Sequence, residues 1–358
     1  MRRGKTGVTD WPRFRIRTGT GDLLALGESL GAVSDWNGVA DAKQDLFVGD
    51  FGMRFADGSL ADLDGDGAAE LVLGQWGLAG GSGPAIARKN ADGAWGEPVS
   101  VAGDVPGEPF DTLVLDFDED GVPDAYMCHH RGVALGPNTF WRGDGEGGLV
   151  EATPPGAAIQ DACMSVSAAD LNGDERLDLL LAVGSGPILL LADATGYVDA
   201  TNAWGLPGTD GEQMTWGSAL GDLDNDGLFD AIVTTSDFTG LDTGIWPAWA
   251  FRQVEAGRFE EIGEDLGLPP VGGTRSVLVH DINADGVLDI LMSDIHRGPW
   301  LFESRGCGAA AWLEVEAPEG TVVTVHSEGR TWTQPVTLPR GIHPRGGGEP
   351  SENGIGSG

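Results

Sequence analysis

The sequence is poor in cysteine and in basic residues, and it contains no long apolar run. Its 358 residues include 3 Cys, and 21 Lys and Arg stand against 56 Asp and Glu, a net charge of −35. The electrostatic field of this net negative charge opposes binding to nucleic-acid backbones and to anionic membranes. Three cysteines are too few for a disulfide framework. Because the longest apolar runs have only the length of strands, the sequence predicts neither membrane insertion nor a signal peptide.

Glycine and proline are plentiful instead, with 59 Gly and 20 Pro. So many turn formers disfavour long helices and favour short strands joined by tight turns. The excess carboxylates must be solvated or matched by cations, and Ca²⁺ is the cation best suited to acidic turns. We therefore expect an all-β protein with Ca²⁺ as its cofactor.

An acidic nine-residue pattern, DxDxDGxxD in its fullest form, occurs five times, with spacings of 54, 54, 52 and 59 between the first aspartates. The copies, here called the first to fifth acidic loops, are Asp62–Glu70, Asp116–Asp124, Asp170–Asp178, Asp222–Asp230 and Asp281–Asp289. An apolar run and a Gly-rich turn follow each loop, which predicts the order strand, loop, strand, turn, strand. A unit of about fifty residues with four short strands is the size of a β-propeller blade.

The ends of the chain determine the number of blades. The strand-like segments after the fifth loop are His296–Phe302, Trp312–Val315, Thr321–His326 and Thr331–Thr337. We expect the first two to complete the fifth blade. The last two would join Phe14–Arg17 and Leu23–Leu26 in a sixth blade, so that both chain ends share one sheet and close the ring. Six blades are predicted, with seven as the alternative if Val33–Asp50 belongs to a further blade.

The acidic repeats resemble FG-GAP or VCBS repeats, as in integrin α-chain propellers, over roughly residues 53–303. The segments Trp312–Glu316 and Thr321–Arg330 resemble the ASPIC/UnbV region of cartilage-acidic-protein-like proteins. The resemblance implies a propeller over 1–311, with an N-terminal half blade and five motif-bearing blades, then an ASPIC/UnbV-like β segment over 312–340. The polar, Gly-rich residues 341–358 are expected to be disordered. Members of such a family are secreted or surface-exposed calcium-binding proteins.

The acidic loops have the alternation that calcium ligation needs. Ca²⁺ takes about 6–8 oxygen ligands, here side chains at positions 1, 3 and 5, the backbone carbonyl at position 7 and a closing acid at position 9. The apolar residue at position 2 should point away and pack. The predicted ligands are Asp62, Asp64, Asp66, Ala68, Glu70, Asp116, Asp118, Asp120, Val122, Asp124, Asp170, Asn172, Asp174, Arg176, Asp178, Asp222, Asp224, Asp226, Leu228, Asp230, Asp281, Asn283, Asp285, Val287 and Asp289.

Two features of the loops leave room for another interpretation. Asp-Gly turns form without any metal, so a single copy of the pattern would favour neither interpretation. The third loop is the poorest copy, because Glu175 replaces the turn glycine where a Cβ is penalised in the left-handed conformation. Five copies in phase favour metal binding for the array.

The turns between the second and third strands of each unit should lie on the face opposite the acidic loops. The candidate recognition residues there are Trp76, His129, His130, Arg131, His296 and Arg297. The competing interpretation is that the repeat preserved ordinary turn residues. Nearby, Cys128 and Cys163 fall on neighbouring inner strands, and either a disulfide or two buried thiols fits that placement.

No nucleophile elbow, phosphate-binding loop, HExxH or dinucleotide-binding pattern is present. The sequence therefore favours a non-enzymatic, calcium-stabilised binding or adhesion module for a protein or glycan. Because modest-affinity loops would be empty at cytosolic calcium levels, we expect an extracellular, cell-surface or periplasmic location. The alternative is an enzyme or biosynthetic accessory protein of the UnbV type, with a site on the opposite face that includes Asp294. The oligomeric state is left open.

Overall fold

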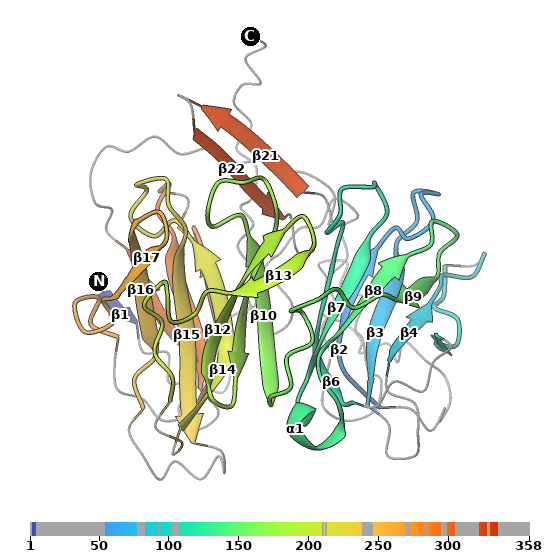
Figure 1. The fold of residues 1–358 in the computed structure, drawn as a ribbon, viewed down its shortest axis with the longest axis horizontal. Helices are drawn as coiled ribbons and strands as arrows, with labels where there is room; N and C mark the ends of the chain where they lie inside the picture. The colour runs from blue at the N-terminus through green and yellow to red at the C-terminus, as the bar shows by residue number, and fades with distance from the viewer. Residues whose placement is uncertain are drawn as a thin grey trace.

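The computed structural model describes residues 2–4, 54–76, 83–91, 93–101, 107–209, 211, 213–237, 246–268, 273–283, 285–294, 299–304, 322–327 and 330–335. Within these ranges the chain is almost entirely β, and the single helix is α1 (Gly132–Leu135). The strands form five four-stranded antiparallel sheets and one two-stranded hairpin (Figure 1). The prediction of an all-β protein built from repeated four-strand units is confirmed.

The sheets follow the order of the acidic loops. Sheet 1 contains β2 (Arg54–Ala61), β3 (Glu70–Trp76), β4 (Pro84–Ala87) and β5 (Val99–Ser100). Sheet 2 contains β6 (Pro109–Leu115), β7 (Asp124–His129), β8 (Thr139–Gly143) and β9 (Leu149–Glu151). Sheet 3 contains β10 (Cys163–Ala169), β11 (Asp178–Val183), β12 (Gly186–Asp193) and β13 (Gly196–Asp199).

The remaining strands complete the set. Sheet 4 contains β14 (Gln213–Gly221), β15 (Asp230–Asp237), β16 (Trp249–Glu255) and β17 (Arg258–Glu261). Sheet 5 contains β18 (Thr274–His280), β19 (Asp289–Asp294), β20 (Trp300–Glu303) and β1 (Arg2–Gly4). The hairpin consists of β21 (Val322–Ser327) and β22 (Arg330–Pro335). In every sheet the acidic loop joins the first two strands of its repeat unit.

The outer strand of sheet 5 differs from the prediction. The sequence predicts Trp312–Val315 beside the strand that ends at Phe302, but β1 occupies that edge, with Arg2 opposite Glu303 and Gly4 opposite Leu301. A strand edge accepts one partner, and β1 fills this edge. A strand from the N-terminal end of the chain does join a late sheet, but it joins sheet 5. Trp312–Val315, Phe14–Arg17, Leu23–Leu26 and Val33–Asp50 lie outside the described residues.

The C-terminal hairpin is predicted to supply inner strands of a sixth blade, and the strands predicted beside it, Phe14–Arg17 and Leu23–Leu26, lie outside the described residues. Among the described residues, β21 and β22 pair only with each other. The hairpin lies over the ends of the sheets that carry the acidic loops, toward the top of Figure 1. Asp170 at the start of the third loop donates its N–H to the Thr333 carbonyl at 2.9 Å, and Val322 packs against the core between sheets 2 and 3. These contacts hold the hairpin to β10.

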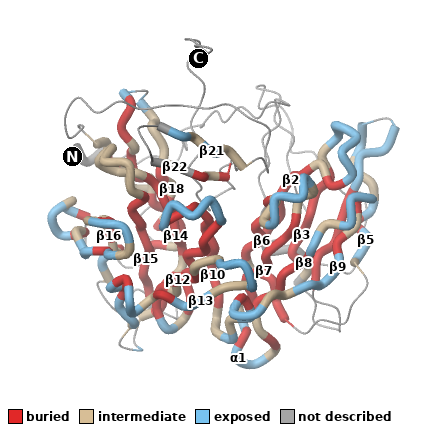
Figure 2. Tube along the Cα trace, turned by 45° about the horizontal axis from the view of Figure 1, so that its top comes forward, coloured by how far each residue is buried: buried red, intermediate tan, exposed pale blue. Residues whose placement is uncertain are grey.

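The hydrophobic core lies between neighbouring sheets. Four clusters of buried side chains fill the spaces between sheets 1 and 2, 2 and 3, 3 and 4, and 4 and 5. Because both faces of an inner sheet are covered in this way, β11 is a continuous apolar run after Asp178, and all its residues are buried. Figure 2 shows the same division, with buried strands and exposed connections at the sheet ends.

The inner strands β2, β6, β10, β14 and β18 contact one another in chain order. Side-chain hydrogen bonds join some of them directly. Asp57 Oδ2 accepts the N–H of Thr112 at 3.0 Å, and Asp111 Oδ2 accepts the N–H of Val166 at 2.9 Å. The next pair of inner strands is joined through the hydroxyl groups of Ser165 and Ser218, 3.1 Å apart. The sheets therefore form one continuous array around their inner strands.

A disulfide joins Cys128 on β7 to Cys163 on β10. Of the two alternatives that the sequence leaves open, the structure has the covalent one. The bond links sheets 2 and 3, and both cysteines are fully buried. Cys307 lies outside the described residues.

Candidate metal centres and the opposite ends of the sheets

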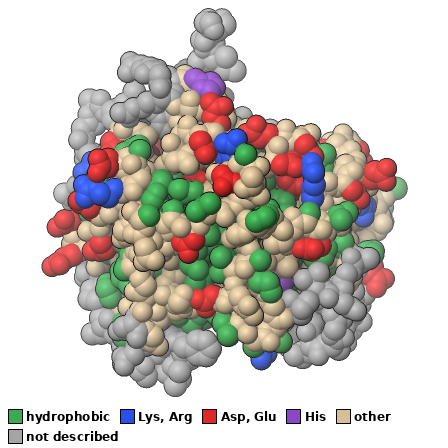
Figure 3. Space-filling model, in the orientation of Figure 1, with side chains coloured by type: hydrophobic (Ala, Val, Ile, Leu, Met, Phe, Trp, Pro, Cys, Tyr) green, Lys and Arg blue, Asp and Glu red, His purple; other side chains and the backbone are tan. Residues whose placement is uncertain are grey.

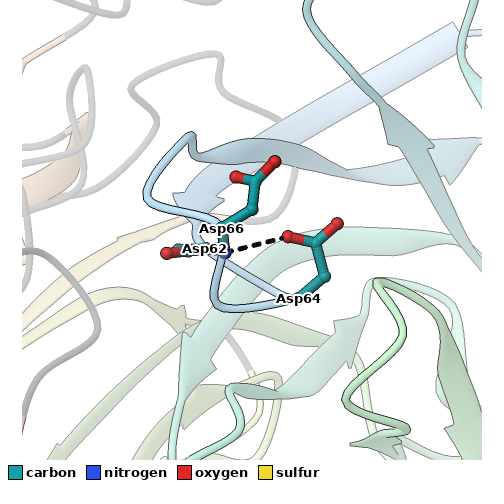
Figure 4. A group of neighbouring side chains, drawn as sticks. All are labelled: Asp62, Asp64 and Asp66. Carbon is teal, nitrogen blue, oxygen red and sulfur yellow. Dashed lines mark hydrogen bonds between the residues drawn. The ribbon is translucent and has the colours of Figure 1, made fainter.

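The acidic loops repeat one pattern of hydrogen bonds. In the first loop, Asp62 Oδ1 accepts the N–H of Asp66 at 3.1 Å, and its Oδ2 accepts that of Gly67 at 2.9 Å. Asp66 Oδ1 then accepts the N–H of Ala68 at 2.7 Å. The other four loops make the equivalent bonds. Figure 4 shows the three aspartates of the first loop, which all come from one short turn.

Each described sixth-position residue has a positive φ, which wraps the backbone around the first carboxylate. It is glycine in four loops, with φ between 83 and 87°, and Glu175 in the third, with φ 69°. The strain that the sequence predicts at Glu175 is therefore present. The third loop still forms the same bonds, because Glu175 N–H reaches Asp170 Oδ2 at 2.9 Å. The backbone geometry of this loop thus persists without its glycine.

The closing acids are buried and fix the loops to the sheets. Asp124 Oδ2 accepts the N–H of Phe117 at 3.2 Å, and Oδ1 accepts that of Gly143 on β8 at 2.9 Å. The third, fourth and fifth loops make the same double contact through Asp178, Asp230 and Asp289. Burial raises the pKa of Asp124, Asp178 and Asp230 to about 7 and shifts the pKa of Glu70 and Asp289 in the same direction. These acids are structural anchors, a role that their ligand-like spacing does not indicate.

Four of the five apolar second positions pack as predicted. Leu63 and Leu171 are buried in the clusters beside sheets 1 and 3. Phe117 and Leu223 pack against the clusters beside sheets 2 and 4. Because this residue points to the core, its two neighbours project their carboxylates the other way.

Three loops gather carboxylate oxygens closely enough to surround one ion. The groups are Asp62, Asp64 and Asp66; Asp116, Asp118 and Asp124; and Asp222, Asp224 and Asp230, each with one oxygen per residue within 4.8 Å of the others. The third and fifth loops carry Asn172 and Asn283 at the third position. In the fourth loop, Asp224 Oδ1 is buried and has no hydrogen-bond partner among the residues that the structure describes. A hard oxygen donor set with an orphaned buried oxygen fits Ca²⁺. The carbonyl ligation at position 7 stays a prediction.

The predicted recognition residues at the opposite ends of the sheets differ in how far they are exposed. His129 is fully buried, with Nε2 3.0 Å from Thr139 Oγ1, and its ring lies against Gly107, where any Cβ would overlap it. Its Nδ1 has no hydrogen-bond partner. Burial lowers the pKa of His129 to about 4. The side chain thus lies beneath the surface where a partner would bind.

The two residues after His129 are accessible. Arg131 has a side chain 54% exposed and lies 3.4 Å from Glu108 Oε1, while the other Glu108 oxygen is buried without a partner. His130 is half-buried, with its ring 5.3 Å from that of Phe110. Asp294 is buried and accepts a hydrogen bond from Trp300 Nε1 at 3.4 Å. His296, Arg297 and the Trp76 side chain lie outside what the structure describes.

A second set of side chains at these ends was not predicted. Phe110, Trp216 and Arg275 lie where a β-bulge interrupts the inner strands β6, β14 and β18. The Arg275 guanidinium lies 3.4 Å from the Trp216 ring centre, and Phe110 meets Trp216 edge-on at 6.5 Å. Phe110 and Trp216 touch although β10 runs between their strands, so both project into the space that the inner strands surround. Each residue stands six positions before the first aspartate of its acidic loop, a regularity that the sequence does contain.

These features define an all-β protein of repeated antiparallel sheets, each with an acidic loop between its first two strands. Comparison with protein families matches residues 62–127, 132–181 and 222–292, more than half of the chain, to the FG-GAP-like repeat. The chain therefore belongs to the FG-GAP-like repeat family. No helix among the described residues is long and apolar enough to span a membrane.

Individual relatives are more distant. No curated protein matches the chain. Among solved structures, a lectin of Agrocybe aegerita that recognises non-reducing terminal N-acetylglucosamine is 19% identical, with TM-score 0.46 over 77% of this chain and 72% of the lectin. A rhamnogalacturonan lyase of Bacillus licheniformis is 16% identical, with TM-score 0.39 over 79% of this chain and 56% of the lyase.

Proposed function

We propose that the protein is a calcium-stabilised β-propeller that acts as a secreted or surface binding module for a protein or a glycan. The observation that carries the calcium part is the fourth loop, where three carboxylate oxygens lie within 4.8 Å of one another and Asp224 Oδ1 is buried without a partner. A cation would satisfy that oxygen and offset the repulsion among the carboxylates. The ordered contacts of the inner strands support the propeller.

The disulfide and the C-terminal hairpin support the rest of this assignment. Disulfides persist in oxidising compartments, so the bond between Cys128 and Cys163 favours residence outside the cytoplasm. External calcium would also keep loops of modest affinity filled. The hairpin of β21 and β22 corresponds to the strand pair of the proposed ASPIC/UnbV-like segment.

Calcium dependence is tested by comparing the unfolding of metal-free protein in excess chelator with its unfolding in Ca²⁺. Each ion bound only by the folded state adds about 2.7 kcal/mol at one hundred times its Kd, so the melting temperature should rise markedly with calcium. Mg²⁺ at the same concentration is the control, because it prefers fewer protein ligands and keeps its waters. An unchanged melting curve for protein shown by elemental analysis to be free of metal would rule out the calcium part.

The binding role belongs to the ends opposite the acidic loops. Arg131 is half exposed there, near a half-buried set of aromatic and cationic side chains, and Arg and Trp are favoured anchors of binding interfaces. The acidic surroundings favour a basic or neutral partner. Replacing Arg131 and Arg297 together by Ala should reduce binding to a glycan or peptide array while the calcium-dependent melting temperature stays nearly constant. A much lower melting temperature would make the two arginines structural turn residues instead.

A further inference from the structure

In two of the acidic loops, the carboxylates pair with an arginine from the third strand of the same sheet. Arg142 on β8 places one guanidinium nitrogen 2.8 Å from Asp118 Oδ2 and 2.8 Å from Asp120 Oδ2. Arg252 on β16 places the equivalent nitrogen 2.5 Å from Asp224 Oδ2 and 3.2 Å from Asp226 Oδ2. In both loops one cation thus bridges the third-position and fifth-position carboxylates. Along the upper part of the face in Figure 3, basic side chains likewise lie beside acidic ones.

The strand register places an arginine at the same position in three sheets. In each of these sheets the residue after the closing acid pairs with a residue of the third strand, and the arginine comes directly after that partner in the chain. The three arginines are Arg142, Arg252 and Arg88. The guanidinium of Arg88 donates to the carbonyl of Gly147 in the neighbouring sheet, and its charge also lowers the pKa of Glu70 in the first loop against the larger effect of burial. Sheets 3 and 5 have Leu191 and Glu303 at this position.

The arginines occur with one type of loop. The first, second and fourth loops have aspartate at the third position, and their sheets carry Arg88, Arg142 and Arg252. The third and fifth loops have Asn172 and Asn283 there, and their sheets carry no such arginine. In the third loop a looser pair forms between Arg176 and Asp174, 3.6 Å apart. An additional loop carboxylate is therefore accompanied by an additional cation.

We propose that Arg142 and Arg252 are internal counter-ions of the second and fourth acidic loops, which hold these loops together without calcium and lower their affinity for it. This inference rests on the proposed calcium binding. The guanidinium contacts carboxylate oxygens that a cation would need, so it must share them or move away. Either way it opposes a second positive charge. The side chains of Arg142 and Arg252 are 52% and 43% exposed, so water screens the effect and the change in Kd should be only about three- to tenfold.

The test is a calcium titration of the variant Arg142→Leu, Arg252→Leu, followed through the melting temperature and through calorimetry against a competing chelator. In excess chelator this variant should melt below the wild type, because the paired carboxylates lose their counter-ion. In calcium the deficit should vanish, and half of the rise should need about three- to tenfold less calcium. The reciprocal variant Leu191→Arg should need more calcium than the wild type.

Arg258→Leu is the matched control. Arg258 also pairs with two carboxylates, those of Glu255 and Glu260, but it lies on β17 and touches no acidic loop. It removes one positive charge, so it corrects for overall charge when it is compared with each loop substitution made singly. If the leucine variant does not fold, Arg142→Gln with Arg252→Gln replaces it, and the paired lysine variant should keep the response of the wild type.

The outcomes separate this inference from the proposed function. A wild type that responds to calcium while the leucine variant responds equally or more weakly overturns the counter-ion role, because the arginines would then orient the ligands or do nothing. A wild type that does not respond to calcium overturns the proposed function and this inference together. If the leucine variant needs less calcium than the wild type and Arg258→Leu does not, the result supports both the counter-ion role and the proposed function.

Discussion

The two ends of the same sheets differ in how faithfully they repeat. At the acidic-loop ends, five copies make the same bonds between backbone N–H groups and carboxylates, even where Glu175 replaces glycine. At the opposite ends the two turns that the structure describes in full are different: sheet 2 has the helix α1, whereas sheet 3 has a two-residue turn whose Ser185 donates to Asp161. The acidic-loop ends are uniform because the backbone of every loop has to close around a carboxylate. The other end is free to carry contacts specific to this protein.

The largest expected effect sharpens this comparison at the opposite ends. Replacing Cys128 and Cys163 together by Ala should lower the free energy of unfolding by about 4 kcal/mol, since the bond closes a loop across 35 residues. Because the bond lies away from the acidic loops, the loss should be equal in calcium and in chelator. Denaturant unfolding measures both values, with Cys307→Ala as the control. A loss seen only in chelator would mean that the two ends are coupled.

A smaller effect follows from the buried imidazole of His129. Its pKa of about 4 in the folded state lies below the value of about 6.5 expected for the unfolded chain, so the unfolded chain binds more protons between these pH values. Stability should therefore fall as the pH drops from 7 toward 4, by about 2 kcal/mol at pH 5 from this group alone. The variant His129→Gln cannot titrate, and its unfolding free energy should converge with that of the wild type as pH falls. Parallel pH profiles would contradict the assignment.

The smallest expected effect tests the uniform ends. Glu175→Gly should stabilise the protein by up to about 1 kcal/mol, because glycine adopts the φ of 69° without a Cβ penalty. Glu175→Gln removes only the charge and is the control. Thermal unfolding in calcium should show a gain for the glycine variant beyond that of the glutamine variant. Equal gains in melting temperature for the two variants would mean that the effect comes from charge. Backbone strain at this position would then not explain the difference between the third loop and the others.

The sequence predicts sheets 1 to 4 well because their contacts are local. A single repeat unit contains both strands of each ladder in these sheets, so periodicity and turn residues are enough. The edge of sheet 5 was mispredicted because its two strands, β1 and β20, are far apart in the chain. No local pattern distinguishes one distant strand from another as the partner for an open edge.

The residues of the candidate site likewise differ in whether local sequence spacing predicts them. The positions of the loop aspartates follow from their spacing, and Phe110 and Trp216 could have been found by counting six residues back from each loop. Arg142 and Arg252 could not, because 22 residues separate Arg142 from Asp120 and 26 separate Arg252 from Asp226. The turn between the second and third strands varies in length, so only the strand register places these arginines on the loops.

The pairing of β1 with β20 has a consequence for synthesis. Residues 2–4 are made about three hundred residues before their partners at 301–303. Sheets 1 to 4 can form in turn as the chain emerges, whereas β1 has to wait without its partner until β20 is made. Contacts of such long range form slowly, and an unpaired edge invites association with other chains. The strand β1 is therefore the one that a nascent chain has most need to shield.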